Sequence, residues 1–335
     1  MLLIDAIYIN NSGGKVLLDY LIEEIEKTEI PVFYLLDSRI FKNHPSIKSS
    51  NKIAYCNATL LKRHLFYKKN KKNFNKVLCF GNIPPSIKLE IDVFTYFHQP
   101  LFIETPKSIS LFNKLKIKIK TIILDLLKNN TNYWLVQSNN VKYGLCEKYH
   151  ILESHVVVLP FYSTLVISKE IVRNKFKFIF ISNTGIHKNH IKLIEAFCKF
   201  YDENKKGILG LTVPSFSHLE NNLIQSLILK GYPIENYGFI DRNKLAEIYA
   251  SAEYLIFPSL AESFGLGLVE AIDAGCKVIG ANLPYMHAVC EPSILFDPYS
   301  LESIKEAFEM GIEDNVRPTI KKVKNEIDTL IDLLK

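Results

Sequence analysis

Short apolar runs alternate with amphipathic stretches along most of this 335-residue chain. In the first half the apolar runs predict buried strands, and the amphipathic stretch Lys15–Lys27 between two of them predicts a helix. Apolar strands separated by helices are typical of a parallel sheet that is covered on both faces. The predicted strands of this half are Leu3–Ile9, Val32–Leu36, Lys52–Cys56, Lys76–Phe80, Asp92–Phe97, Tyr133–Gln137 and Val156–Leu159.

The same alternation starts again beyond Pro160. The predicted strands are Phe176–Ser182, Ile208–Val213, Ile234–Phe239, Tyr254–Phe257 and Lys277–Ile279, and the predicted helices are Lys188–Tyr201, His218–Leu229, Asn243–Ala250, Gly267–Ala274 and Ile320–Leu334. We therefore predict two doubly wound α/β domains, residues 1–162 and 163–318. A C-terminal helical segment, residues 319–335, is expected to pack back on the first domain. The chain is long enough for two cores of this size.

Charge is unevenly distributed between the two predicted domains. Residues up to Pro160 carry 22 Lys and Arg against 13 Asp and Glu, a net charge of +9, while the remainder carries 19 against 22, a net charge of −3. This asymmetry indicates that the first domain meets an anionic partner. A hydrophobic content of 48% and an aromatic content of 12% exclude a disordered chain.

Two lysine-rich stretches account for much of that positive charge. Leu61–Lys76 holds seven Lys or Arg with three interleaved aromatic residues, and Asn113–Lys128 alternates lysine with apolar residues. One interpretation is that the first stretch is a solvated loop and the second an ordinary surface helix. The other is contact with an anionic membrane surface, with apolar residues inserted among head groups. Nucleic acid is not an expected partner, because no nucleic-acid-binding motif accompanies the charge.

The six cysteines are scattered along the chain, which predicts reduced thiols with neither a disulfide framework nor a zinc site. The N-terminal apolar run lacks a basic leader and contains Asp5, so it is interpreted as a strand, not a secretory signal. We find no apolar run long enough to span a bilayer. The expected location is the cytoplasm, either free or on the inner face of the cell membrane.

The most informative stretch runs from Phe257 to Val289. A strand is expected to end at Phe257, at the carboxyl edge of its sheet, where open α/β sheets bind ligands. Gly265 and Gly267 allow the backbone to come close to a ligand, and the helix that begins there directs its free amides toward the same place. This arrangement suits a phosphate group or the polar face of a sugar.

Glu262 and Glu270 lie eight residues apart around this loop. Carboxylates are good acceptors for paired hydroxyl groups, so the two could hold two polyol parts of one ligand. The alternative is a strand–loop–helix connection without a binding role, in which both glutamates are ordinary surface carboxylates. The stretch resembles the glutamate-x7-glutamate signature of retaining GT-B glycosyltransferases of family 4, the glycosyl transferases group 1. That resemblance implies two Rossmann-like domains facing each other across a cleft.

The resemblance also implies residue roles. Glu262 would contact the donor sugar and Glu270 the ribose, while Ser263, Phe264, Gly265 and Leu266 would line the donor pocket. Ile181–Phe197 resembles the first strand–loop–helix of the family's second domain, where Lys188 would hold the diphosphate. The arginine that usually accompanies this lysine is absent, and Ser182 and Asn183 stand near its place. The nucleotide base would lie against Gly238, Phe239 and Ile240.

In the first half, Ile9–Leu21 resembles the family's glycine-rich loop, and Gly13 and Gly14 would face the diphosphate and acceptor. Taken alone these glycines make only a tight turn, because the dinucleotide fingerprint is incomplete. His98 follows a strand end, at the family position of a histidine near the donor sugar. A loop histidine with an ordinary structural role is the alternative.

Together these features predict an enzyme that transfers a sugar from a nucleotide-sugar to an acceptor hydroxyl with retention of configuration. The likeness implies no metal ion and no cofactor, a lipid-linked glycan acceptor, and a role in bacterial surface polysaccharides such as O-antigen or capsule. Three alternatives remain: a catalytically silent nucleotide-sugar-binding subunit, an epimerase or phosphorylase on the same fold, and nucleic-acid binding by the basic half.

Overall fold

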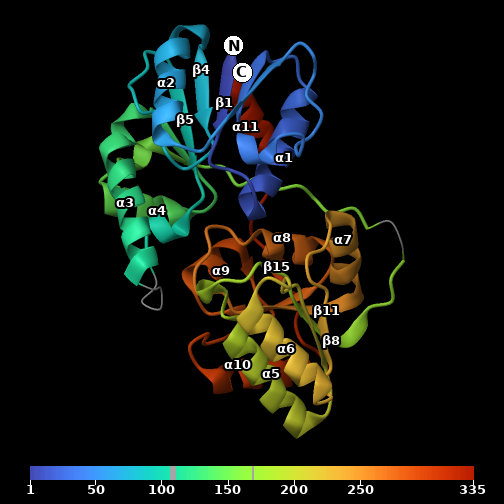
Figure 1. Ribbon diagram of the computed structural model, residues 1–335. Coiled ribbons are helices and arrows are strands. Elements are labelled where there is room, and N and C mark those ends of the chain that lie inside the picture. Colours follow the sequence, from blue (N-terminus) through green and yellow to red (C-terminus); the bar gives the residue numbers. More distant parts are fainter. Residues whose placement is uncertain (106–110, 168–169) are drawn as a thin grey trace. The chain divides into compact units, whose positions relative to one another are not determined.

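The computed structural model describes residues 1–105, 111–167 and 170–335, and it divides them into two compact units. Unit 1 comprises the described residues of Met1–Ser163 together with Lys324–Lys335, and unit 2 comprises those of Thr164–Val323. Figure 1 shows the elements of both units in chain order. The first crossing between units lies one residue beyond the predicted boundary, and the return crossing lies at Val323, five residues beyond residue 318.

Unit 1 is built on a parallel sheet with strand order β3-β2-β1-β4-β5-β6-β7. Its strands are β1 (Leu2–Ala6), β2 (Val32–Asp37), β3 (Lys52–Cys56), β4 (Lys76–Cys79), β5 (Asp92–Phe97), β6 (Tyr133–Val136) and β7 (Val156–Val158). Its helices are α1 (Ser12–Glu26), α2 (Leu60–Asn70), α3 (Leu111–Leu127), α4 (Asn139–Tyr149) and α11 (Ile327–Leu334). Successive strands extend from β1 toward β3, and the chain then returns to place β4 on the other side of β1, so the order reverses beside β1.

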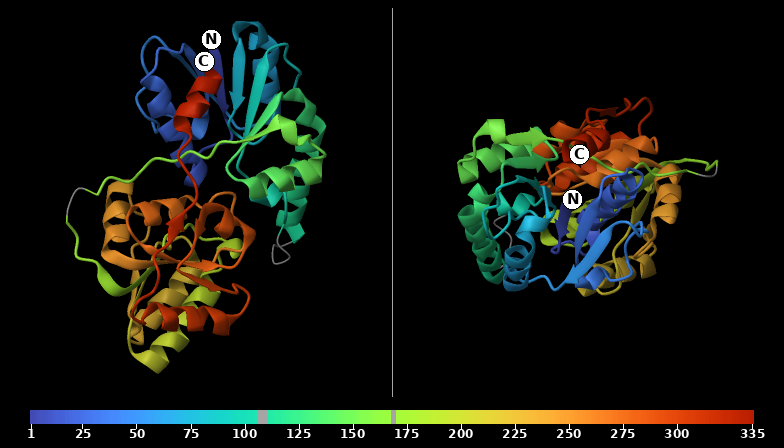
Figure 2. Two further views of the ribbon diagram at one scale, coloured as in Figure 1. Left: turned by 180° about the vertical axis from the view of Figure 1, so that it is seen from behind. Right: turned by 90° about the horizontal axis from the view of Figure 1, so that it is seen from above.

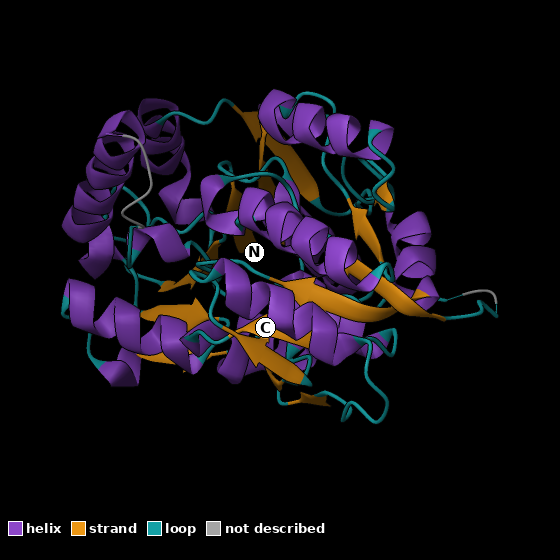
Figure 3. Cartoon of the chain, turned by 90° about the horizontal axis from the view of Figure 1, so that it is seen from below, coloured by secondary structure: helices purple, strands orange, loops and turns teal. Residues whose placement is uncertain are grey.

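Unit 2 repeats this architecture with strand order β10-β9-β8-β11-β12-β14, again parallel. Its strands are β8 (Asn174–Phe180), β9 (Ile208–Leu211), β10 (Ile234–Asn236), β11 (Ala252–Phe257), β12 (Lys277–Ala281) and β14 (Ile294–Phe296). Its helices are α5 (His190–Asn204), α6 (His218–Leu229), α7 (Arg242–Ser251), α8 (Leu266–Asp273), α9 (Pro284–Val289) and α10 (Leu301–Gly311). Here the order reverses between β8 and β11. Figure 3 shows the helices in purple and the strands in orange.

Apolar strand residues form the cores on both faces of each sheet. In unit 1 one core contains β1, β2 and α1 side chains together with those of α11, and a second core contains Leu3, Val77 and Tyr67. In unit 2 the rings of Phe178 and Phe308 lie 5.0 Å apart, centroid to centroid, and Phe200 lies 5.4 Å from Phe308. Strands buried on both faces by such residues explain the nearly continuous apolar runs of the sequence.

The C-terminal segment differs from the prediction of one helix over Ile320–Leu334. Ile320–Lys321 forms β15, which pairs antiparallel with β13 (Cys290–Glu291), and α11 begins only at Ile327. Because Ile320 and Lys321 pair with β13, they are extended and do not belong to the helix. Helix α11 then buries Ile327, Leu330, Ile331 and Leu334 in the core of unit 1, so both chain ends lie in that unit (Figure 2).

The basic stretch Leu61–Lys76 also differs from the solvated loop of one interpretation. Its first part is helix α2, capped by Thr59, whose hydroxyl accepts a hydrogen bond from the Lys62 amide. Arg63 and Tyr67 are one helical turn apart and point into the core, whereas Leu61 and Leu65 are exposed. The inward face of α2 is therefore polar and its outward face partly apolar.

Candidate donor site

Unit 2 brings two loops together at the point where its strand order reverses. Strands β8 and β11 are neighbours, so the segments that follow their carboxyl ends must lie side by side. Ligands of open α/β sheets bind at such a point. The Leu260 amide donates a hydrogen bond of 2.7 Å to the His187 carbonyl, which joins the loop after β11 to the loop after β8. The Asn189 side-chain amide lies 3.4 Å from the Pro258 carbonyl in the loop after β11, and it also donates to the Pro298 carbonyl after β14 at 2.9 Å.

This junction brings Lys188 and Glu262 into direct contact. The Lys188 ammonium donates a hydrogen bond to Glu262 Oε1, and the two side chains are 18% and 13% exposed. A charged pair that is shielded but still reachable can exchange partners with a ligand. A phosphate could take the ammonium group, and sugar hydroxyls could then donate to the carboxylate. The structure thus places together two residues that lie 74 positions apart in the sequence.

Glu270 lies in α8 and is nearly fully buried. Its Oε1 pairs with Arg242 Nη1 at 2.9 Å, and the Tyr249 hydroxyl lies 3.5 Å from its Oε2. Burial raises the pKa of the Glu270 carboxyl above its ordinary value, and the nearby Arg242 charge opposes that rise. Glu270 is therefore a buried carboxylate with Arg242 at one oxygen and the Tyr249 hydroxyl at the other.

Arg242 was not identified from the sequence. Asp241 caps α7 by accepting a hydrogen bond of 2.9 Å from the Lys244 amide, which makes Arg242 the first residue of that helix. From there the guanidinium reaches Glu270 in the next helix of the chain. A capping aspartate before a predicted helix was visible, but nothing in the sequence shows which acid an arginine 28 positions away will meet.

The loop between the two acids approaches the sheet closely. Gly265 has φ +75°, a left-handed conformation that favours glycine, and α8 begins at the next residue. A Cβ added at Gly267 would lie 3.2 Å from the Tyr249 hydroxyl and 3.6 Å from the Ile181 carbonyl, so α8 starts against the end of β8. Ser263 is partly exposed, as is Leu266, but Phe264 is only 1% exposed, so its ring packs inside and does not line a donor pocket in this structure.

Phe239 and Ile240 lie in the loop after β10, at the same edge of the sheet. Gly238 has φ +65°, and its amide lies 3.3 Å from Oδ1 of Asn236, which also holds the Val213 backbone. The Phe239 side chain is 88% exposed and Ile240 is half-buried. This loop is therefore braced by Asn236, while the Phe239 ring stays accessible.

Near Lys188 the structure adds two histidines. Burial, followed by the Lys188 charge, lowers the pKa of His187 below its ordinary value. Burial lowers the pKa of His190 to about 3, and its ring lies 4.7 Å from that of Phe180. Ser182, which stands near the expected arginine, is fixed by a 3.0 Å hydrogen bond from its amide to the Thr212 hydroxyl. Lys188 therefore carries the positive charge of this loop.

Unit 1 brings together its own predicted site residues at the carboxyl edge. A Cβ added at Gly14 would lie 3.4 Å from Cε1 and 3.8 Å from Nε2 of His98, while Gly13 has open space around it. The His98 amide donates a 2.6 Å hydrogen bond to Asn82 Oδ1, and burial lowers the pKa of its ring to about 4. His98 is therefore neutral at pH 7, and Gly14 lies directly beside its ring.

Behind this edge lies a sealed charge network that the sequence did not reveal. Arg63 Nε donates to Asp5 Oδ2 at 2.7 Å, and the Tyr67 hydroxyl donates to the same oxygen at 2.6 Å. The other Arg63 nitrogens donate to the Pro84 carbonyl at 2.7 Å and the Ile83 carbonyl at 2.9 Å. Arg63 is only 2% exposed, so it takes no part in the basic surface to which the sequence assigned it.

Within the described residues, no cluster of three or more His, Cys, Asp or Glu side chains could hold a metal ion. Among the same residues, none of the helices combines the length and the hydropathy that crossing a bilayer requires.

Comparison with known families identifies the domain that contains this sheet edge. Residues 164–327 match the model of the family described as glycosyl transferases group 1. Unit 2 is a glycosyl transferases group 1 domain. This group 1 domain contains Lys188, Glu262, Arg242 and Glu270, and hence the whole edge described above.

Individual proteins resemble parts or all of the chain. The "O-antigen chain mannosyltransferase B" of Escherichia coli is 24% identical over 141 residues, which are 41% of this chain and 37% of that protein. The curated relatives are matched over only 9% to 37% of their length. Sucrose-phosphate synthase from Thermosynechococcus elongatus superposes with a TM-score of 0.71 at 15% identity, over 93% of this chain and 89% of that chain.

A second solved structure, Anabaena Alr3699/HepE in complex with UDP-glucose, has a TM-score of 0.68 at 14% identity, over 93% of this chain and 89% of that chain. At these identities the likeness establishes the fold. The chain has the GT-B fold, with one doubly wound parallel sheet in unit 1 and another in the group 1 domain.

Proposed function

We propose that this protein is a retaining glycosyltransferase that binds a nucleotide-sugar on its group 1 domain and transfers the sugar to an acceptor hydroxyl. The observation that carries the proposal is the Lys188–Glu262 pair at the point of strand-order reversal, with Glu270 in the adjoining helix. A cation for the diphosphate and two carboxylates for polyol hydroxyls then share one sheet edge.

Each group has a distinct task in this proposal. Lys188 and the first amides of α8 stabilise charge on the departing diphosphate, because fixed donors act strongly in a shielded site. Glu262 accepts hydrogen bonds from sugar hydroxyls once Lys188 has turned to phosphate. Glu270, held by Arg242, accepts from the ribose, and the loop with Phe239 and Ile240 receives the base.

Unit 1 supplies the acceptor side. His98 is neutral at pH 7, so it acts as a hydrogen-bond partner of the sugar and not as a cation, and the Gly13–Gly14 loop leaves room beside it. Retention without an enzymic nucleophile assigns proton removal from the acceptor to the leaving phosphate. We expect neither glutamate to act as the base, and we expect transfer to continue in the presence of EDTA.

A bacterial surface polysaccharide is the proposed product. Two likenesses support it: the name of the O-antigen chain mannosyltransferase B concerns O-antigen in that protein, and the HepE structure holds UDP-glucose. A panel of nucleotide-sugars screened by thermal shift identifies the donor here, because a ligand that binds only the folded state raises its stability.

The decisive experiment compares Glu262→Ala with Glu306→Ala, a matched control on the exposed side of α10. We expect Glu262→Ala to abolish transfer while the protein stays folded, and Glu306→Ala to leave transfer unchanged. Full turnover by folded Glu262→Ala protein would contradict the assignment. Donor binding by the wild type without transfer or hydrolysis would identify a silent binding subunit, and donor isomerisation without acceptor would identify an epimerase.

We further propose that unit 1 contacts an anionic membrane surface through α2 and α3. At about 100° per residue, five exposed apolar residues of α3 fall within an arc of about 80°. They are Leu111, Leu115, Ile119, Ile122 and Leu126. Leu124 is buried on the opposite side, and lysines flank the apolar stripe on both sides: Lys114 and Lys118 on one, Lys116 and Lys120 on the other. Apolar residues flanked by lysines are typical of interfacial helices.

Helix α2 adds Leu60 and Leu61 to this surface, and the two helices enclose an apolar groove of about 360 Å³. We expect the double variant Leu115→Ser, Ile119→Ser to lose binding to anionic vesicles while keeping its stability, because both side chains are exposed. Leu219→Ser, Leu229→Ser in unit 2 is the control, since these leucines are even more exposed, at 72% and 88% against 57% and 51%. Equal vesicle binding by both variants would exclude the surface.

A further inference from the structure

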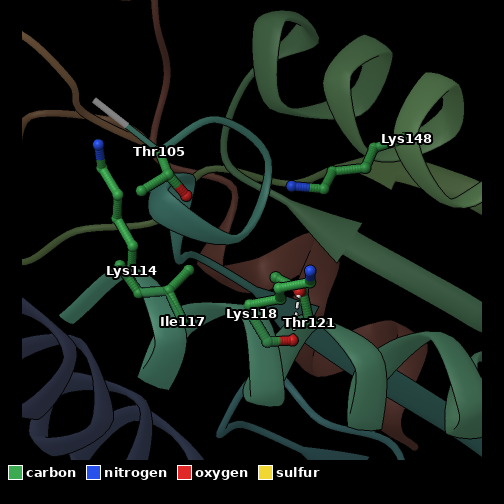
Figure 4. A pocket seen from close by; sticks show the side chains of 6 residues that line it. All are labelled: Thr105, Lys114, Ile117, Lys118, Thr121 and Lys148. Atoms are coloured by element: carbon green, nitrogen blue, oxygen red, sulfur yellow. Dashed lines mark hydrogen bonds between the residues drawn. The ribbon is translucent and has the colours of Figure 1, made fainter. Parts of the chain in front are cut away.

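Helices α3 and α4 of unit 1 enclose a small hollow of about 250 Å³ that is lined mainly by lysines and threonines. Its lining residues are Thr105, Lys114, Ile117, Lys118, Thr121 and Lys148. Figure 4 shows Lys148 extending from α4 toward the loop that carries Thr105, while Lys114, Ile117, Lys118 and Thr121 project from α3. Pockets for larger ligands are usually about 300–1,000 Å³, so this one suits a small polar group.

The walls of the hollow are fixed by packing and hydrogen bonds. The Lys148 ammonium donates to the Ile103 carbonyl at 2.7 Å, and the Tyr149 hydroxyl donates to the Phe102 carbonyl at 2.7 Å. A Cβ added at Gly144 would lie 2.6 Å from Ile103 Cγ2, so α4 presses directly on this loop. On the other wall Leu124 of α3 is buried in the adjoining core. The lysines therefore extend from a rigid frame.

Positive charge gathers at the hollow, because three of its six lining residues are lysines. Across the part of the chain that the structure describes, no carboxylate lies within ion-pairing distance of Lys118 or Lys148. Glu104 is close enough to favour the charged form of Lys148, yet burial lowers the pKa of that ammonium overall. Like charges gathered at one place repel each other, and an anion that binds among them removes this repulsion. Lysine is a common phosphate ligand, acting as a point charge with three donors.

We propose that this lysine hollow, lined by Lys114, Lys118 and Lys148, binds a phosphoryl group. Lys114 and Lys118 line the hollow and also flank the apolar stripe of α3. A phosphate bound in the hollow therefore lies next to the proposed membrane surface. The phosphoryl group belongs either to a lipid or to a soluble ligand. The lipid case rests on the membrane contact proposed above. The hydrogen bond from the Lys148 ammonium to the Ile103 carbonyl uses one of its three N–H groups and fixes the orientation of the other two.

The test compares three variants at equal net charge: Lys118→Gln and Lys148→Gln in the hollow, and Lys120→Gln on the opposite flank of the same helix. Binding is measured on vesicles containing phosphatidate or phosphatidylglycerol, adjusted to the same surface charge. Loss of any lysine near the surface is expected to weaken binding to both by about fivefold. We expect a further loss of about tenfold on phosphatidate alone for the two hollow variants, and none for Lys120→Gln.

A soluble arm uses inorganic phosphate with acetate as the control, and follows thermal unfolding. Stabilisation by phosphate that disappears in Lys118→Gln and Lys148→Gln, without a vesicle preference, would assign the hollow to a soluble ligand. Equal behaviour of all three variants toward both lipids, with no differential effect of phosphate, would overturn the proposal. Lys118→Gln keeps the Ile103 hydrogen bond intact, so it guards against a misfolded Lys148 variant. Donor binding to unit 2 in the same variants reports separately on the proposed function.

Discussion

Two buried acids, Asp5 in unit 1 and Glu270 in unit 2, each pair with an arginine, yet the two pairs differ in access. Arg63, the partner of Asp5, is 2% exposed, and the side chain of Arg242, the partner of Glu270, is 36% exposed. The first pair is closed to ligands by strands, α2 and the Ile83–Pro84 backbone. The second is reachable from the sheet edge. A buried charge therefore indicates a binding role only when its partner is open to solvent.

The physical consequences of the two arrangements are opposite. A buried charge that loses its partner cannot recover solvation, so breaking a sealed pair costs much of a domain's stability. An open pair can lose one member to a ligand or to water at small cost. The predictions below test this contrast between the sealed pair of unit 1 and the open pairs of unit 2.

The largest effect is expected for Asp5→Asn, which leaves Arg63 charged and buried without its counter-ion. We expect a loss of about 3–5 kcal/mol in the free energy of unfolding. Trp134 is the chain's one tryptophan and lies buried in β6, so its fluorescence during urea unfolding reports on unit 1. Donor binding by unit 2 should persist. A loss below about 1 kcal/mol would show that the network is not sealed in solution.

Lys188→Met should have the opposite effects: a large loss of donor affinity and a smaller loss of stability. We expect donor affinity to fall about 100-fold, because a charge-assisted contact with the diphosphate is lost. Stability should fall by less than for Asp5→Asn, because Glu262 keeps some access to solvent where Arg63 has almost none. Titration calorimetry with the nucleotide-sugar measures the first quantity. Lys192→Met is the control, because this lysine lies on α5 and donates to the Tyr299 carbonyl away from Glu262. Equal affinities of both variants would remove Lys188 from the site.

Glu270→Gln should separate binding from stability most clearly. We expect about a tenfold loss of donor affinity, since a neutral amide accepts more weakly from ribose hydroxyls. Burial raises the folded-state pKa of Glu270, so its contribution to stability is present below the unfolded pKa and is lost as pH rises through the folded pKa. The variant should therefore lose less stability than the wild type between acid and neutral pH. Stability curves at several pH values check this sign.

The smallest effect is expected for His98→Gln. The folded-state pKa of His98 is about 4, below the usual histidine value, so its contribution to stability is present above the unfolded pKa and is lost as pH falls through the folded pKa. We expect the stability curve of the variant to be flatter than that of the wild type below about pH 6.5 and parallel to it above. Parallel curves over the whole range would show that His98 titrates normally.

The sequence predicted the features that depend on local pattern. Alternating runs predicted every strand of the unit 1 sheet and five of the six in the unit 2 sheet, missing the short strand β14, and the glycines around Glu262 and Glu270 identified the loop between β11 and α8. Contacts between distant segments could not be predicted in this way. Nothing distinguished Arg63 from its neighbouring lysines as the partner of Asp5, and Arg242 carried no signal of its own. Ile320–Lys321 followed a helical pattern and was drawn into a strand by β13.

The return of α11 to unit 1 imposes an order on biosynthesis. The described residues of unit 2 are continuous in the chain, whereas the core beside α1 includes Ile327, Leu330 and Ile331, which leave the ribosome after them. Domains generally fold as units during translation. The apolar face that α11 covers therefore stays exposed on the nascent N-terminal half until the last residues of the chain are synthesised.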